Sequence, residues 1–114
     1  MCPDQLGPSL VRAAPDIDVL AYPTLAPAAQ VDWTDYEQRN TAADPGRIAE
    51  QLAQRVSDTG GHVWLVSRGG YRTFGVQCEQ LETELSVRLG PGQTIVAPDE
   101  NVFEPARLSV IPQL

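Results

Sequence analysis

The segment HVWLVSRGGYRTFGVQCEQLETELSVRL, residues 62–89, contains an apolar run, a glycine turn and an amphipathic stretch in succession. The run His62–Ser67 is short and flanked by glycines, which predicts a strand that is covered on both faces. Gly69–Gly70 predicts a tight turn, and a helix is predicted to begin near Thr73 because apolar residues then recur every three or four positions. The residues of this apolar stripe are Phe74, Cys78, Leu81, Leu85 and Leu89. Strand, turn and helix in this order form half of a βαβ unit.

Two further helices are predicted before this segment. The first runs from Gln5 to Ala14, with Asp4 as its N-cap. The second begins at Asp44, which caps it, has Pro45 at its first helical position and ends before Gly60–Gly61. Its predicted buried stripe consists of Ile48, Ala49, Leu52, Ala53 and Val56.

Three more strands complete the predicted fold, at Asp16–Tyr22, Thr94–Ala97 and Arg107–Ile111. Strands that alternate with helices of about ten residues are typical of an α/β fold. We therefore predict a small, mainly parallel sheet of about four strands flanked by helices, a Rossmann-like three-layer arrangement that does not bind a nucleotide. The turns that follow parallel strands share one edge of a sheet. The segments predicted to lie at this edge are Cys2–Asp4, Pro23–Thr24, Arg68–Thr73 and Asp99–Asn101.

Length and charge limit the possible functions. A chain of 114 residues is long enough for one domain, which we assign to residues 1–114. The net charge of −7 argues against a nucleic-acid surface, which needs clustered cations. No apolar run approaches the roughly 20 residues that span a bilayer. A helix opens the chain without a preceding strand, so we expect the sequence to be a C-terminal piece of a longer protein.

The glycine turn is the best candidate site. Its backbone N–H groups could converge at a helix N-terminus, and two arginines could add charge-assisted hydrogen bonds. The predicted anion or sugar-phosphate contacts are Arg68, Gly69, Gly70, Tyr71, Arg72 and Thr73. The segment matches neither GxGxxG nor GxxxxGK[ST], so it does not predict a nucleotide site. The alternative is that the turn is purely structural.

Other polar residues give no catalytic or metal site. His62, the only histidine, and Ser67 belong to one predicted strand, whose positions do not provide the convergent geometry of a catalytic dyad. One histidine and two distant cysteines lack metal-ligand spacing, so neither a metal nor another cofactor is predicted. The carboxylates Asp32, Asp35 and Glu37 are read as solvated caps. Their neighbours Trp33 and Tyr36 are predicted to anchor the connecting segment on the core.

The two cysteines, Cys2 and Cys78, leave the compartment open. In a reducing cytosol they would remain thiols, and in an oxidising compartment they would be expected to pair. Cys2 is predicted at the sheet edge where the helix bearing Cys78 begins. A disulfide between them is therefore geometrically feasible.

Several segments together resemble the C-terminal extracytoplasmic domain of actinobacterial polytopic membrane glycosyltransferases. The matching segments are CPDQLGPSLVR, VDWTDYEQRN, AADPGRIAEQL, HVWLVSRGGYRTFGVQCEQL and FEPARL. The parent proteins resemble the GT-C class, mannosyltransferase-like enzymes that use polyprenyl-phosphate sugars. In that class the catalytic carboxylate lies between transmembrane helices, so the resemblance implies that no residue of this chain is catalytic.

The resemblance implies a noncatalytic accessory domain on the extracytoplasmic face of the membrane. Its expected partners are the transmembrane catalytic half and an acceptor glycan or polyprenyl-phosphate sugar, contacted through the Arg68–Thr73 edge. The alternative is a stand-alone acidic α/β binding protein of the cytoplasm, which a native start at Met1 and free thiols would favour. A small independent enzyme is the weakest interpretation, because no nucleophile or acid–base pair is assembled.

Overall fold

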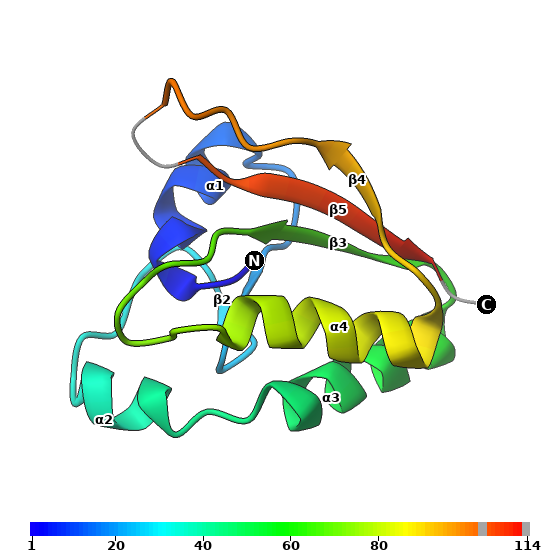
Figure 1. The fold of residues 1–114 in the computed structure, drawn as a ribbon, viewed down its shortest axis with the longest axis horizontal. Helices are drawn as coiled ribbons and strands as arrows, with labels where there is room; N and C mark the ends of the chain where they lie inside the picture. Colours follow the sequence, from blue (N-terminus) through cyan, green and yellow to red (C-terminus); the bar gives the residue numbers. More distant parts are fainter. Residues whose placement is uncertain (103–104, 113–114) are drawn as a thin grey trace.

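The computed structural model describes residues 1–102 and 105–112, so Phe103 and Glu104 of the FEPARL segment lie outside it. The elements in chain order are η1 (Asp4–Leu6), α1 (Gly7–Ala13), β1 (Leu20–Ala21), β2 (Ala26–Pro27), α2 (Tyr36–Thr41), α3 (Pro45–Thr59), β3 (His62–Ser67), α4 (Gln77–Leu89), β4 (Gln93–Val96) and β5 (Arg107–Pro112) (Figure 1). Within the described part, no helix is both long and apolar enough to cross a membrane.

Both sheets are antiparallel, so the prediction of a mainly parallel, Rossmann-like three-layer sheet is wrong. The larger sheet has the order β3-β5-β4, and β5 runs antiparallel to both of its neighbours. β3 and β4 therefore run in the same direction and are connected through α4, with β5 inserted between them. This is a split βαβ unit. The predicted strand, turn and helix are present, but the sequence pattern could not show that the last strand would separate the two parallel ones.

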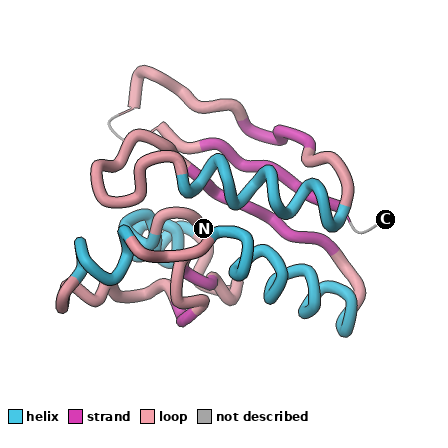
Figure 2. The backbone as a smooth tube through the Cα atoms, turned by 60° about the horizontal axis from the view of Figure 1, so that its bottom comes forward, coloured by secondary structure: helices cyan, strands magenta, loops and turns pink. Residues whose placement is uncertain are grey.

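The helices cover one face of β3 and β5, whereas β4 is exposed at all four of its residues. α3 and α4 lie side by side against this face (Figures 1 and 2). Leu65 and Ile111 point toward the helices and are buried, whereas Trp64 on the opposite face is 59% exposed. Around α1, a second small cluster covers the opposite face only near Val66 and Ala106. The prediction that β3 is covered on both faces is therefore wrong.

The predicted apolar stripe is confirmed as buried at all five positions, although only Cys78, Leu81, Leu85 and Leu89 belong to α4 and Phe74 precedes it. The predicted start near Thr73 is wrong, since α4 begins at Gln77. Gly75 has a φ of +51°, outside the helical region, and its N–H donates to the carbonyl of Tyr71 in a separate turn. The preceding segment therefore approaches the helix as a turn rather than as its first residues.

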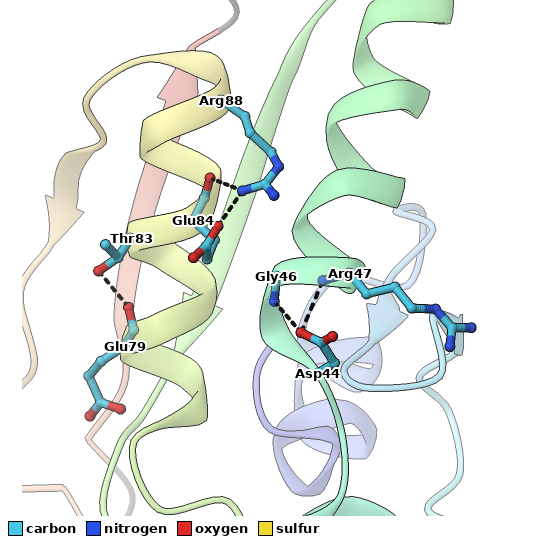
Figure 3. A network of polar contacts seen from close by, with 7 residues as sticks. All are labelled: Asp44, Gly46, Arg47, Glu79, Thr83, Glu84 and Arg88. Carbon is cyan, nitrogen blue, oxygen red and sulfur yellow. Dashed lines mark hydrogen bonds and ion pairs between the residues drawn. The ribbon is translucent and has the colours of Figure 1, made fainter.

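The predicted N-terminus of α3 is also confirmed. Asp44 accepts hydrogen bonds from the N–H groups of Gly46 and Arg47, at 3.0 and 3.2 Å, and Pro45 is the first helical residue (Figure 3). Glu84 of α4 lies close by, because a Cβ built on Gly46 would be 3.8 Å from its carboxyl carbon. The N-terminus of α3 therefore lies beside α4.

The first 41 residues differ more from the prediction. A short 3-10 helix, η1, precedes α1, and no side chain caps either of them, so Asp4 is not an N-cap. The predicted strand Asp16–Tyr22 is reduced to the two residues of β1, because only these pair with β2. The helix α2 was not predicted. The elements in this part of the chain are short and have few capping or periodicity signals in the sequence, so their formation depends on tertiary contacts.

Through backbone hydrogen bonds, Met1 and Cys2 link the end of β1 to the end of β3. The carbonyl of Met1 accepts a hydrogen bond from the N–H of Tyr22 at 2.9 Å. The N–H of Cys2 donates to the carbonyl of Val66 at 2.8 Å, and its carbonyl accepts from the N–H of Arg68 at 3.0 Å. This pairing with β3 is parallel and limited to an isolated bridge. It places the first cysteine beside the helix that carries the second.

The amino group of Met1 is expected to make stability depend on pH. It donates to the carbonyl of Leu20 at 2.9 Å, and burial lowers its pKa from 8.0 to about 6. The unfolded chain binds this proton below about pH 8 and the folded chain only below about pH 6. In a chain with a free amino group at Met1, the free energy of unfolding should therefore rise by roughly 2–3 kcal/mol between these two values.

Urea unfolding at a series of pH values would measure this rise. Acetylation of the amino group removes its titration and provides the control. A free energy of unfolding that stays constant or falls across this interval in the unmodified chain would contradict the prediction.

Candidate functional site

A cavity of about 350 Å³ lies at the end of the sheet where β3 and β4 terminate. It is lined by Ser67, Arg68, Gly69, Cys78, Glu79, Pro98, Glu100, Pro105 and Arg107. Because β3 and β4 run in the same direction, the segments that follow them meet at this edge. The predicted proximity of the Arg68 turn and the Asp99–Asn101 segment is thus present, although the sheet differs from the one that was predicted.

The six residues of the predicted anion contact do not converge. Arg68 lines the cavity, and its guanidinium carbon lies 5.3 Å from the ring centroid of Tyr71. Arg72 points elsewhere and forms an ion pair at 3.0 Å with Glu37 of α2. Thr73 interacts through its carbonyl, which accepts a long 3.5 Å hydrogen bond from the hydroxyl of Thr41. The side chains of Arg68 and Arg72 therefore contact different residues and do not point toward one common site.

A carboxylate already occupies the position beside the glycine turn. A Cβ built on Gly69 would lie 1.8 Å from Oε1 of Glu79, which is in the first turn of α4. Gly70 has a φ of +86°, a left-handed conformation that glycine adopts without strain. The turn thus allows a glutamate to approach the backbone closely. Anion binding at this turn stays a prediction, and Glu79 would oppose it electrostatically.

Among the described residues that line the cavity, the formal charges balance. Two arginines, Arg68 and Arg107, face two glutamates, Glu79 and Glu100. Arg107 also forms an ion pair with Glu82 of α4. Such a lining offers both hydrogen-bond donors and acceptors, and it suits a neutral, hydroxyl-rich ligand better than a phosphate.

The sulfur atoms of Cys2 and Cys78 are joined in a disulfide, with the two Cα atoms 5.6 Å apart. Both residues are almost fully buried in the main core cluster, and Cys78 also forms part of the cavity wall. The bridge ties the N-terminal residues, which lie between β1 and β3 in space, to the first turn of α4. The sequence left this pairing open.

A buried polar cluster lies between the N-terminal segment, α2 and α4. The hydroxyl of Tyr22 donates to Oε1 of Gln77 at 2.6 Å, and Nε2 of Gln77 donates to the carbonyl of Asn40 at 3.0 Å. The hydroxyl of Tyr36 donates to Asp4 at 2.6 Å. Burial raises the pKa of Tyr22, of Tyr36 and of Asp4. These hydrogen bonds satisfy groups that would otherwise be costly to bury.

Of the remaining candidates from the sequence, Ser67 lines the cavity, whereas His62 and Asp32 do not. His62 is exposed at the start of β3, and Ser67 is buried at its end. Asp32 accepts hydrogen bonds from the N–H of Thr34 and from Arg39, which lower its pKa. Among the described residues, no group of three histidine, cysteine or acidic side chains is placed to hold a metal ion.

Sequence reasoning missed Glu79 and Arg107 of the cavity, whereas Glu100 belongs to the Asp99–Asn101 segment that was predicted at this edge. Glu79 lies in the first turn of the helix that follows the glycine turn, so its proximity to that turn could have been predicted. Arg107 could not, because its position depends on β5 lying between β3 and β4. Comparisons of the chain with models of protein families, with curated proteins and with solved structures found no match.

Proposed function

We propose that this chain is a noncatalytic extracytoplasmic accessory domain of a membrane glycosyltransferase that uses polyprenyl-phosphate sugars. The observation that carries the extracytoplasmic assignment is the buried disulfide between Cys2 and Cys78. Disulfides persist in oxidising compartments and are rare in the cytosol. The glycosyltransferase assignment rests on the sequence resemblance, which includes the segments around both cysteines.

The arrangement of reactive side chains supports an accessory role. Cys78 is held in the disulfide and is therefore not available as a nucleophile. His62 and Ser67 lie at opposite ends of β3. The charge-balanced cavity at the Arg68 edge supports a contact with sugar hydroxyls, and the catalytic step would belong to the transmembrane half of the parent protein.

Fractionation of the source cells, with an antibody against this chain, tests the proposal. We expect a large band in the membrane fraction that is degraded when protease is added outside intact spheroplasts. We also expect that a thiol-reactive polyethylene glycol modifies Cys2 and Cys78 only after reduction. A cytosolic band near 12.4 kDa with two reactive thiols would contradict the proposal.

Activity provides the second part of the test. Deletion of the domain from the parent protein should impair sugar transfer, and the isolated domain should show none. Transfer by the isolated domain would refute the accessory role.

One observation favours the alternative, an acidic α/β protein that binds another protein. Trp64 and Val96 expose apolar surface on the open face of the larger sheet, at 59% and 53% of their full area. Large exposed apolar side chains on an uncovered sheet face can mark contacts between proteins. The cytosolic outcome of the fractionation would select this alternative, and the membrane outcome would assign the same face to contact with the rest of the parent protein.

A further inference from the structure

Trp33 is one of the most exposed large side chains of the protein, at 63% of its full area. The prediction that Trp33 anchors the connecting segment on the core is therefore wrong. Tyr36 has that role instead, because it is partly buried and packs against the main core cluster. The indole of Trp33 lies against the ring of Tyr36, with centroids 4.7 Å apart and planes tilted by 38°. The indole is thus supported from one side and open to solvent.

The support beneath Trp33 is fixed by contacts with the core. The ring of Tyr36 packs edge-on against Phe74, with centroids 5.9 Å apart and planes at 85°. Its hydroxyl donates to the buried Asp4 at 2.6 Å. The tyrosine is therefore held both by packing and by a hydrogen bond to the N-terminal segment, and it gives the indole a rigid base.

The backbone around Trp33 is also held in place. Asp32 accepts a hydrogen bond from the N–H of Thr34 at 2.9 Å. Arg39 forms an ion pair with the carboxylate of Asp32 at 3.1 Å and donates to its carbonyl at 2.6 Å. An aromatic side chain ordered before binding loses little conformational entropy when a ligand arrives. The exposed indole is thus preorganised.

The surroundings of the indole indicate the chemical class of its ligand. Asp35 and Glu37 are exposed close to it in the chain, and Glu37 is paired with Arg72. Stable interfaces between proteins cover about 800 Å² per partner with an apolar centre, which a single indole among charged groups does not provide. The excess of carboxylates disfavours a phosphate. A sugar fits both features, because one face of a pyranose presents C–H groups and its rim presents hydroxyls.

We propose that Trp33 is a carbohydrate-binding platform: the C–H face of a pyranose stacks on the exposed indole, and its hydroxyls donate to the carboxylates of Asp35 and Glu37. This inference rests on the proposed function in one respect, since an extracytoplasmic domain of a glycosyltransferase would meet an acceptor glycan. The platform is distinct from the Arg68 cavity, because none of its residues lines that cavity.

NMR titration of the 15N-labelled chain with gluco-, galacto- and manno-configured tetrasaccharides tests the proposal. The chain has two tryptophans, so Trp64, which is also exposed, is an internal control. At least one tetrasaccharide should shift the indole N–H signal of Trp33 and leave that of Trp64 unchanged. The variant Trp33→Ala should bind about tenfold more weakly, equivalent to about 1.4 kcal/mol, and Trp64→Ala should bind like the native chain.

The variant Trp33→Phe retains a ring and should recover part of the affinity, which a purely structural effect would not require. The proposal is overturned if no tetrasaccharide shifts the Trp33 signal, or if Trp33→Ala binds as tightly as the native chain. A shift caused by tetramethylammonium but by no sugar would instead identify a cation site. Sugar binding by a cytosolic chain with free thiols would disprove the proposed function alone, and a membrane location without sugar binding would disprove the platform alone.

Discussion

Replacing both Cys2 and Cys78 by alanine should lower the free energy of unfolding by about 4 kcal/mol. The bridge spans a sequence separation of 76 residues, so its loss greatly increases the conformational freedom of the unfolded chain. Loss of the bridge also releases the N-terminal residues, which lie between β1 and β3 in space, from α4. Most globular domains are stable by only about 5–15 kcal/mol, so the change is a large fraction of the total.

Urea unfolding of the native chain, of the native chain with a reducing agent, and of the double alanine variant measures this effect. The reduced chain keeps both sulfur atoms, so its difference from the oxidised chain isolates the cross-link. The double variant should be slightly less stable than the reduced chain, because it also lacks two buried thiols. Equal midpoints for the oxidised and reduced chains would contradict the predicted stabilisation.

Leu85→Ala should lower the free energy of unfolding by about 3–5 kcal/mol. Leu85 has no exposed surface and lies in the stripe with which α4 covers the larger sheet. It also belongs to the main core cluster together with Ile48 of α3 and Ile111 of β5. Truncation would therefore leave a cavity where α3, α4 and the larger sheet meet, and partial collapse would not fill it.

The matched control is Val87→Ala, two residues further along the same helix. Val87 is 78% exposed, so its truncation should change the free energy of unfolding by less than about 0.5 kcal/mol. Chemical denaturation of both variants under the same conditions tests the contrast. Similar losses at the two positions would mean that the buried stripe is not what holds α4 in place.

The helices that cover the sheet could be predicted because their signals are local. Asp44 and Pro45 specify the start of α3 through a side-chain cap and a fixed φ angle. The apolar spacing of α4 specifies which side of the helix is buried. Gly75 prevents the helix from starting earlier, and its effect was missed because a positive φ is not visible in a periodicity.

The arrangement of the site could be predicted only in part. The sequence places Arg68 after a strand, and a carboxyl end of a strand is a reasonable position for a binding crevice. It does not show that Glu79 approaches Gly69, nor that Arg107 enters the same cavity from β5. It also gave Trp33 and Tyr36 the same role, although only Tyr36 faces the core.

By itself, the sequence determined the main helices, their buried faces and the location of the three strands of the larger sheet, since these follow from contacts within a few residues. Only the tertiary structure decided that β5 enters between β3 and β4, and that Cys2 meets Cys78. Strand order and disulfide pairing depend on contacts between residues far apart in the chain. The free energy that favours one strand order or one disulfide pairing comes from packing of the whole core, so no single segment of the sequence carries a pattern that reveals it.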